Sequence, residues 1–272
     1  KGGFTWNTDF NISFNDNRIL SLNEFEKGKG AEGTETIRKE GEKLDVWYLA
    51  QFTQVDPQKG IALIEQRDDK AWNTRFVTVG TGAEIPMNRS NVEANKFVHS
   101  GKTALPTFYG GLNNRFTYKN FDVSVLLAFS GGNWKLNTIA ERGRRISDIS
   151  NIFKVKGTVW EKPGDIAQYP ELVYGAAYNF DNDGNPITGT TNFEDGNSDF
   201  WLEKADFIRL RNLQIGYSLP GAATKRIGLQ GLRFYAGGTN LATITSYTGL
   251  DPETNGEVTV PRTITFGFNV SF

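Results

Sequence analysis

The single histidine of this chain is the first residue to test for chemistry, because an imidazole can act as a general base or bind a metal. That residue is His99, and it is the only histidine among 272 residues. Either role needs partners such as a pair of carboxylates, and Glu93 is the closest candidate in the sequence. The sequence therefore favours an ordinary loop histidine over a catalytic or metal-binding one.

Oxygen-bearing side chains gather at 181–185, which reads Asp-Asn-Asp-Gly-Asn. Calcium loops place oxygen ligands at alternate positions before a glycine turn, because a hard cation binds several oxygens at one point. The bidentate glutamate of an EF-hand loop is missing, since the twelfth residue from Asp181 is Asn192. The sequence favours a turn without a metal, and calcium binding at 181–185 stays the alternative.

Two further charged groups admit a functional interpretation. Glu194, Asp195 and Asp199 could supply a glycosidase acid pair, but such a pair is defined by a separation in space that a sequence does not give. A basic group could meet an anionic substrate or a partner protein, or could form the solvated face of a helix, and it comprises Arg142, Arg144 and Arg145. We predict that the protein is not an enzyme, with no catalytic, cofactor-binding or metal-binding residue, and we assign no substrate-binding residue.

Composition narrows the class of protein further. The net charge is -1, which indicates no nucleic-acid partner, and the absence of cysteine excludes disulfides and thiolate chemistry. No run of eighteen apolar residues occurs, so no transmembrane helix is predicted. The 20 Phe, 9 Tyr, 6 Trp and 30 Gly suit a membrane barrel with aromatic girdles, and also an all-β sugar-binding protein.

Two long alternating segments define the expected fold. The segment 262–272 alternates five apolar residues with polar or small ones, and 4–14 does the same from Phe4 to Phe14. Strict alternation places all apolar side chains on one face of a strand. Transmembrane β-strands need about 9–11 such residues, whereas strands of soluble sheets are commonly about 5–6 long. The first residues already lie in a strand pattern, and we interpret the chain as processed or as a piece of something longer.

The remaining strands are weaker versions of the same pattern. We expect Asn15–Asn17 to form a tight turn, and the further strands to span Arg18–Phe25, Leu44–Thr53, Ile61–Glu65, Thr107–Tyr118, Phe121–Ser130, Phe200–Leu219 and Leu232–Leu241. The total is about seven to nine strands, depending on how Leu44–Glu65 is counted. Because bacterial barrels have an even number of strands, we expect that this chain does not close a barrel alone.

Connections of two lengths alternate along the chain. Short turns are expected at 15–17, 119–120 and 220–230, and long loops at 26–43, 67–105, 131–199 and 242–259. One or two short helices, broken near Gly143, are expected within 131–199. Short turns at one rim and long loops at the other are typical of outer-membrane barrels.

The alternation also assigns the side chains to faces. We expect the barrel lumen to be lined by Thr5, Asn7, Asp9, Asn11, Asp122, Ser124, Thr263, Thr265 and Asn269. The apolar face should meet outer-membrane lipid, with Trp6 in the barrel wall. For Trp47, Trp134, Trp160 and Trp201, an interfacial girdle and contact with a sugar or a partner stay open; Trp134 and Trp201 border loops.

Several segments together resemble the SusC/RagA-like TonB-dependent outer-membrane transporters. The resemblance is strongest over 199–220, with its Phe-Ile-Arg-Leu-Arg-Asn-Leu strand and Gly-Tyr-Ser-Leu-Pro exit. It continues through 232–252, which contains Gly-Leu-Asp-Pro, and through 261–272. The segments 4–22 and 108–125 also fit, so the resemblance covers nearly the whole chain except the large loops.

This resemblance implies an all-β, transmembrane antiparallel barrel, of which the chain is the C-terminal portion. The whole barrel would have about 22 strands and a plug. Members import glycan oligosaccharides or peptides across the cell outer membrane, energised through TonB and capped by a SusD-like surface lipoprotein. The chain has no room for the N-terminal plug, the TonB-contacting segment or the first half of the barrel, so these are expected as partners on the same or a separate chain.

Two other classes of protein have sequences with a similar alternation of apolar and polar residues. A soluble all-β carbohydrate-binding or glycan-degrading domain would show the same alternation. A small porin-like barrel is a third interpretation, against which the odd strand count argues. Strand length, the sorting of the loops and the ordered segments of resemblance favour the transporter.

Overall fold

The computed structural model describes residues 3–69, 80–144, 159–171, 179–180, 183, 186–187, 197–254 and 258–272. The chain forms two compact units, each built from separate stretches of sequence. The first comprises Lys1–Asn15, Pro106–Gly132 and Ala205–Phe272, and the second comprises Asp16–Leu105 and Asn133–Lys204. None of the helices in the described part of the chain is long and apolar enough to cross a membrane.

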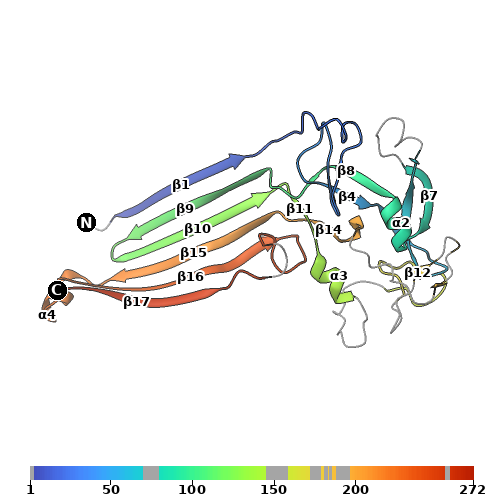
Figure 1. The fold of residues 1–272 in the computed structure, drawn as a ribbon. Coiled ribbons are helices and arrows are strands. Elements are labelled where there is room, and N and C mark those ends of the chain that lie inside the picture. The colour runs from blue at the N-terminus through green and yellow to red at the C-terminus, as the bar shows by residue number, and fades with distance from the viewer. Residues whose placement is uncertain are drawn as a thin grey trace. The chain divides into compact units, whose positions relative to one another are not determined.

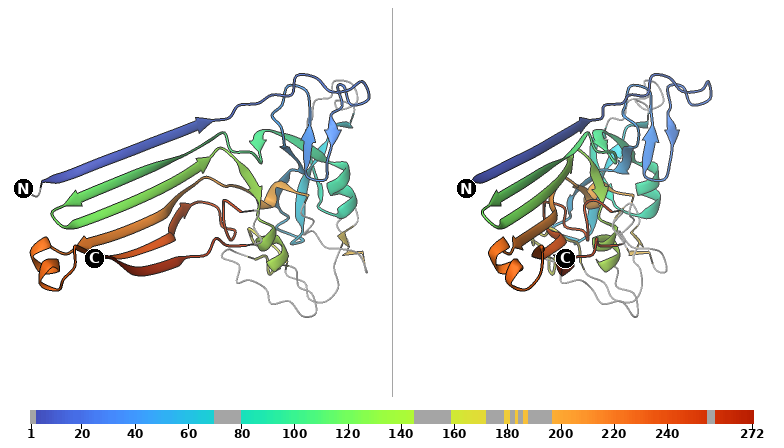
Figure 2. Two further views of the ribbon diagram at one scale, coloured as in Figure 1. Left: turned by 60° about the vertical axis from the view of Figure 1, so that its left-hand side comes forward. Right: turned by 90° about the vertical axis from the view of Figure 1, so that its left-hand side faces the viewer.

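The first unit is one antiparallel sheet of six long strands (Figures 1 and 2). In spatial order these are β1 (Phe4–Phe14), β9 (Phe108–Tyr118), β10 (Phe121–Gly131), β15 (Phe207–Ser218), β16 (Gly231–Thr245) and β17 (Thr263–Ser271). Their lengths run from 9 residues in β17 to 15 in β16. The sheet is open, with β1 and β17 as its edges, which confirms the expectation that this chain does not close a barrel.

The tight turn predicted at 15–17 and the strand predicted after it do not form. Arg18–Phe25 forms no strand, and β1 instead pairs with β9 along its whole length, from Phe4 with Tyr118 to Phe14 with Phe108. The backbone of Ile19 bonds to Gly41 and Glu42, which takes this segment into the second unit. The reason is complementarity: β9 offers an eleven-residue alternating strand, whereas Arg18–Phe25 does not alternate over a comparable length.

The connections of the six-stranded sheet are short at one end and long at the other, but the short turn predicted at 15–17 is instead the start of a long connection. Residues 119–120 and 219–230 join strands at one end of the sheet, and the latter stretch contains α4 (Gly221–Arg226). Residues 15–107, 132–206 and 246–262 leave from the other end. We call these the short-turn end and the long-connection end. The second unit consists almost wholly of the first two long connections.

The long connections contain more regular structure than the predicted loops. Within 26–43 lie β2 (Ala31–Glu32) and β3 (Thr36–Arg38), and within 67–105 lie β7 (Gly80–Pro86), α2 (Arg89–Ala94) and β8 (Lys96–Thr103). These pair with the expected extended segments in two small sheets, ordered β2-β3-β4-β8 and β5-β6-β7. The other three strands are β4 (Val46–Ala50), β5 (Phe52–Val55) and β6 (Ala62–Arg67).

The expectation of plain loops fails here because these short elements gain their stability from tertiary burial. A core of Ala50, Ala62, Ile64, Met87 and Val92 joins β4, β6 and α2. All five residues of β4 are buried, so its sequence lacks the alternation of a half-exposed strand. Asn88 caps α2 by accepting from the backbone N–H of Asn91 at 2.8 Å.

The region 131–199 holds a helix, as predicted, together with short strands. The helix is α3 (Thr138–Arg144), which continues through Gly143. The strands β11 (Trp134–Leu136) and β14 (Leu202–Lys204) pair, as do β12 (Asn179–Phe180) and β13 (Pro186–Ile187). A 3-10 turn, η1 (Asp199–Trp201), precedes β14, so the strand predicted over Phe200–Leu219 begins only at β15.

Candidate functional site: the polar face of the sheet

The register of the six strands assigns every strand residue to one of two faces, because directly paired residues share a face. One row across the sheet is apolar and comprises Trp6, Phe116, Val123, Ile215, Ala236 and Phe266. The adjacent row lies on the opposite face and comprises Asn7, Arg115, Ser124, Gln214, Gly237 and Thr265. The sheet therefore has one mainly apolar face, with Thr8 and Asn114 as polar exceptions, and one mainly polar face.

A bulge preserves these faces where the spacing of the sequence breaks. The pairing of β15 with β10 shifts between Leu210 and Asn212, so that Arg211 is an extra residue relative to β10. Across this shift, Ile208 and Leu210 stay on the apolar face with Leu213. Asn240 opposite has a φ of 53°, a left-handed conformation that asparagine tolerates better than most residues.

The apolar face is largely uncovered. Phe4, Phe266 and Phe268 are 62%, 77% and 66% exposed. At the short-turn end, Phe121 and Tyr217 lie 4.6 Å apart between ring centroids, and Lys119 Nζ lies 5.2 Å from the centre of the Tyr118 ring. Such a face is energetically costly in water and requires an apolar partner.

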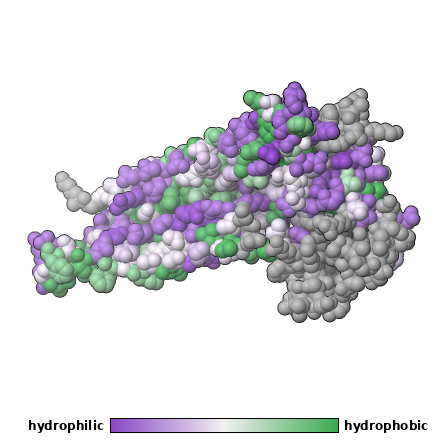
Figure 3. All heavy atoms as spheres, viewed as in Figure 1, coloured by the Kyte–Doolittle hydropathy of each residue, from purple (hydrophilic) through white to green (hydrophobic). Residues whose placement is uncertain are grey.

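The polar face carries all nine residues predicted to line a lumen. An ion pair that the sequence did not reveal lies among them: Arg233 Nη2 is 2.6 Å from Asp122 Oδ2. The pair crosses β15 at Gly216, where a Cβ would lie 2.2 Å from Arg233 Nη2. Arg115 and Tyr235 also occupy this face, opposite Asn7 and Gly267. In the space-filling view, hydrophilic residues form bands along the strands (Figure 3).

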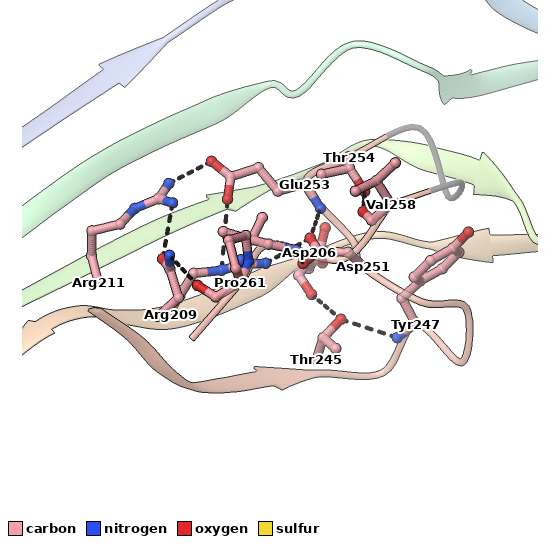
Figure 4. A network of polar contacts seen from close by, with 12 residues as sticks. Asp206, Arg209, Arg211, Thr245, Tyr247, Asp251, Glu253, Thr254, Val258 and Pro261 are labelled. Carbon is pink, nitrogen blue, oxygen red and sulfur yellow. Dashed lines mark hydrogen bonds and ion pairs between the residues drawn. The ribbon is translucent and has the colours of Figure 1, made fainter. Parts of the chain in front are cut away.

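Toward the long-connection end, the connection from β16 to β17 folds back onto the polar face (Figure 4). Arg209 pairs with Ala128 in the register and is therefore on this face, where it is 1% exposed. Its Nη2 donates to Asp251 Oδ1 at 2.6 Å. Burial alone raises the pKa of Asp251, but hydrogen bonds from Arg209 and from the backbone of Glu253 and Val260 outweigh it, so the pKa is lowered from 3.8.

A second ion pair lies beside the first. Arg211 Nη2 is 2.5 Å from Glu253 Oε1, and Arg209 Nε is 3.6 Å from Glu253 Oε2. Asn240 accepts from Arg211 at 3.3 Å and donates to the carbonyl of Pro261 at 3.1 Å. We call the Arg209–Asp251 and Arg211–Glu253 pairs the loop clamp. The loop clamp holds the connection between β16 and β17 against the bulge of β15. This connection therefore covers part of the polar face there.

The sequence carries a signal for the loop clamp, although these four residues were not predicted to meet. The two arginines are two residues apart, and so are the two carboxylates of the Asp-Pro-Glu segment. Equal spacing lets two neighbouring pairs form in register. The segments are 42 residues apart, so the spacing alone does not show that they meet.

His99 lies in the second unit without the predicted partner. Glu93 instead pairs with Lys96 at 2.7 Å, and the nearest carboxylate to His99 is Asp199, with 3.8 Å between His99 Nδ1 and Asp199 Oδ2. Burial lowers the pKa of His99, although Asp199 opposes this. His99 Nε2 lies 3.2 Å from the carbonyl oxygen of Leu49. Among the described residues, no group of three or more His, Asp or Glu side chains could hold a metal.

The tryptophans divide between the units. Trp6 lies on the apolar face, stacked on Phe116. Trp201 takes neither of the two positions left open for it, a girdle or a partner contact, because it is 5% exposed in a core with Trp47 and Leu136. Trp134 packs against that core with Lys102 and Lys204 near its ring at 4.9 Å and 5.7 Å. Trp160 is buried and donates to the carbonyl of Pro57 at 2.9 Å.

Some predicted residues lie outside the described part of the chain. These are Arg145, Glu194, Asp195 and all of 181–185 except Asp183, whose carbonyl accepts a hydrogen bond from Lys59. Arg142 and Arg144 lie in α3, and their side chains also fall outside the described residues.

Solved structures of known proteins match nearly the whole of this chain. Among solved structures, the RagAB peptide importer in its open-open state matches 99% of this chain with a TM-score of 0.70 at 20% identity, and the match covers 27% of that protein's chain. A further structure of the RagAB peptide transporter matches 98% of the chain with a TM-score of 0.68 at 21% identity. The chain therefore shares the fold of the corresponding part of these structures.

Curated relatives of the chain are named as TonB-dependent receptors. TonB-dependent receptor P3 of Formosa agariphila is 26% identical over 302 residues, which cover 99% of this chain and 27% of the receptor. TonB-dependent receptor SusC of Bacteroides thetaiotaomicron is 24% identical over 283 residues, which cover 98% of this chain and 24% of SusC. No family model matches the chain. The chain is SusC/RagA-like and resembles the C-terminal part of a TonB-dependent transporter; it spans about a quarter of the length of these relatives.

Proposed function

We propose that the chain forms part of an outer-membrane importer, with the polar face lining the lumen and the apolar face in contact with lipid. The observation that carries this proposal is the mainly apolar face that extends across all six strands, together with its exposure. Strands of 9 to 15 residues are long enough to cross the hydrocarbon core. Relatives named as TonB-dependent receptors support the same location, the cell outer membrane.

The transported substrate in this proposal is a glycan oligosaccharide or a peptide. Both are polar and flexible, and both can exchange hydrogen bonds with a wall of Thr, Asn and Ser side chains. The charges on the polar face are largely matched, as in the Asp122–Arg233 pair and the loop clamp. A wall of this kind favours substrates without a large net charge. The similar RagAB structure is described as a peptide importer.

Import against a gradient needs an energy source and a means of capturing substrate. We infer that both come from outside this chain: TonB acting through a plug, the remaining N-terminal barrel, and a SusD-like surface lipoprotein as a lid. The edges of the open sheet, β1 and β17, expose unpaired backbone groups that further barrel strands would satisfy.

Uptake in a strain that carries the full-length gene tests this proposal. Isotope-labelled oligosaccharide and peptide mixtures are offered to the wild type, to a deletion strain and to a strain without functional TonB. We expect depletion of one class of substrate by the wild type only. Equal uptake by all three strains, or a full-length protein that stays soluble without detergent, would overturn the proposal. The second result would favour the soluble carbohydrate-binding alternative.

A further inference from the structure

A groove interrupts the apolar face near the short-turn end. Its volume is about 720 Å³, and it lies between β15, β16 and β17. Ala236 forms its floor between Ile215 and Phe266, the paired residues of the neighbouring strands. The next row toward the short-turn end consists of Tyr217, Phe234 and Phe268, which also line it.

The groove exists because β16 places small residues between large ones. Its flanking side chains stand well out of the sheet: Ile215 and Phe234 are each 47% exposed, and Phe266 is 77% exposed. Beyond Ala236 the next residue on this face is Gly238, and the Leu241 side chain covers it, since a Cβ there would lie 2.6 Å from Leu241 Cδ2. The groove is therefore closed toward the long-connection end.

The short-turn end, toward which the groove points, is positively charged. The connection 219–230 carries Lys225 and Arg226, both exposed in the last turn of α4, and it contains no acidic residue. The other short turn, 119–120, carries Lys119, whose ammonium lies over the Tyr118 ring. This local excess of cations contrasts with the net charge of -1 of the whole chain.

We propose that the groove binds one acyl chain of an anionic phospholipid, whose phosphate lies beside Lys225 and Arg226. The inference rests on the proposed position of the sheet in a membrane. An acyl chain is narrow, flexible and apolar, as a groove between aliphatic and aromatic side chains requires. A phosphate is the anion that Lys and Arg bind at a membrane surface. A free phosphate would gain nothing from the groove, so the two features together identify a lipid.

Native mass spectrometry of the purified full-length transporter tests the acyl-chain site. The delipidated protein is incubated with phosphatidylglycerol in detergent, and bound lipid is counted from the mass. Ala236→Phe fills the groove, and Ala242→Phe is the matched control, because Ala242 is on the same face of the same strand but outside the groove. We expect Ala236→Phe to retain about tenfold less lipid, as when about two methylene groups lose their contact. Equal retention by both variants would overturn the proposal.

A second variant tests the headgroup and leaves the barrel wall unchanged. Lys225→Gln with Arg226→Gln removes both cations from exposed positions of α4. We expect the wild type to prefer phosphatidylglycerol to phosphatidylcholine and the double variant to lose that preference. An unchanged preference, or retention of a second protein instead of lipid, would overturn the inference. Unchanged lipid binding in a protein that still imports substrate rejects this inference alone, whereas a detergent-independent soluble protein rejects the proposed function.

Discussion

Arg233 and Asp122 form a two-point ion pair although a whole strand lies between them. Arg233 Nε donates to Asp122 Oδ1 at 3.0 Å, and Nη2 donates to Oδ2 at 2.6 Å. The register places Gly216 directly between them, opposite Asp122 on one side and Tyr235 on the other. Because glycine has no side chain, the guanidinium can cross β15 close to its backbone. The glycine is therefore part of the ion pair's geometry.

Gly216→Ala should break this pair. The added methyl group would lie 2.2 Å from Arg233 Nη2 and 2.5 Å from Asp122 Oδ1, so the guanidinium must move away. Both side chains are partly exposed, at 25% and 19%, so we expect a loss of only about 1–2 kcal/mol. The measurement is the urea concentration at which half of the refolded full-length barrel is unfolded. The folded fraction is detected by its heat-modifiable mobility in gels.

Gly111→Ala is the control for that experiment. Gly111 lies on the same polar face, and a Cβ there would meet nothing closer than 3.5 Å. We expect this variant to match the wild type. A loss of the same size in both variants would mean that any added methyl group on this face destabilises the sheet, and that the ion pair is not the cause.

The two arginines of the loop clamp should differ in energetic weight. The Arg209 and Asp251 side chains are 2% and 8% exposed, whereas those of Arg211 and Glu253 are 33% and 35% exposed. Arg209→Gln leaves a buried carboxylate without its cation and should cost about 3–5 kcal/mol. Arg211→Gln should cost less than about 1 kcal/mol, because solvent screens that pair.

Limited proteolysis of the connection 246–262 distinguishes these outcomes alongside thermal unfolding. Cleavage there should become fast in Arg209→Gln and stay slow in Arg211→Gln. Asp251→Asn should behave like Arg209→Gln if the pair acts as a unit. Protection of the connection in all three variants would show that the clamp does not hold it.

The two faces of the sheet were predictable because alternation is a local property of the sequence. Trp6 and Phe266 lie on the apolar face and Thr265 on the polar one, as expected from their positions alone. The pairing of β1 was not predictable in this way. Asn15 looks like a hairpin turn, but its N–H bonds to the carbonyl of Thr107, far along the chain. The segment 15–17 has the composition of a turn, but β1 pairs with β9 because β9 matches it over its whole length.

The second unit could not be predicted from periodicity for a different reason. Its strand β4 is buried along its whole length, and β8 buries Lys96 and His99, which their residue types would assign to solvent. Lys96 is held there by Glu93 and by the carbonyl of Thr34. Glu93 lies only three residues before Lys96, but Thr34 comes from a distant segment, so a window of sequence contains only part of what holds Lys96 in place.

The burial of His99 predicts a pH dependence for the second unit. Burial lowers the pKa of His99 below its ordinary 6.5, so the unfolded chain binds this proton more readily than the folded one. His99 therefore does not reduce the free energy of unfolding above about pH 6.5. Below that pH the free energy of unfolding falls as the pH drops toward the folded pKa, by at most about 1.4 kcal/mol per pH unit. Pulse proteolysis of the second unit at about pH 5.5 and about pH 7.5 measures this difference.

His99→Gln provides the comparison for that measurement. Its amide can still donate to the carbonyl of Leu49, but it does not titrate. We expect the difference between the two pH values to shrink in this variant. A difference as large as in the wild type would assign the pH dependence to groups other than His99. Glu35 is not among them, because burial raises its pKa and so favours the folded state as the pH falls.

Neighbouring residues of β17 test the assignment of faces to lipid and lumen. Phe266 is on the apolar face and 77% exposed, and Thr265 is on the polar face. Phe266→Arg should cost about 2–4 kcal/mol and impair assembly, because a charge near mid-strand would meet hydrocarbon. Thr265→Arg should be much milder, because its side chain would reach water in the lumen. The measurement is the folded fraction in outer-membrane extracts. Equal losses from the two variants would reject the assignment, since a barrel in a bilayer cannot treat its two faces alike.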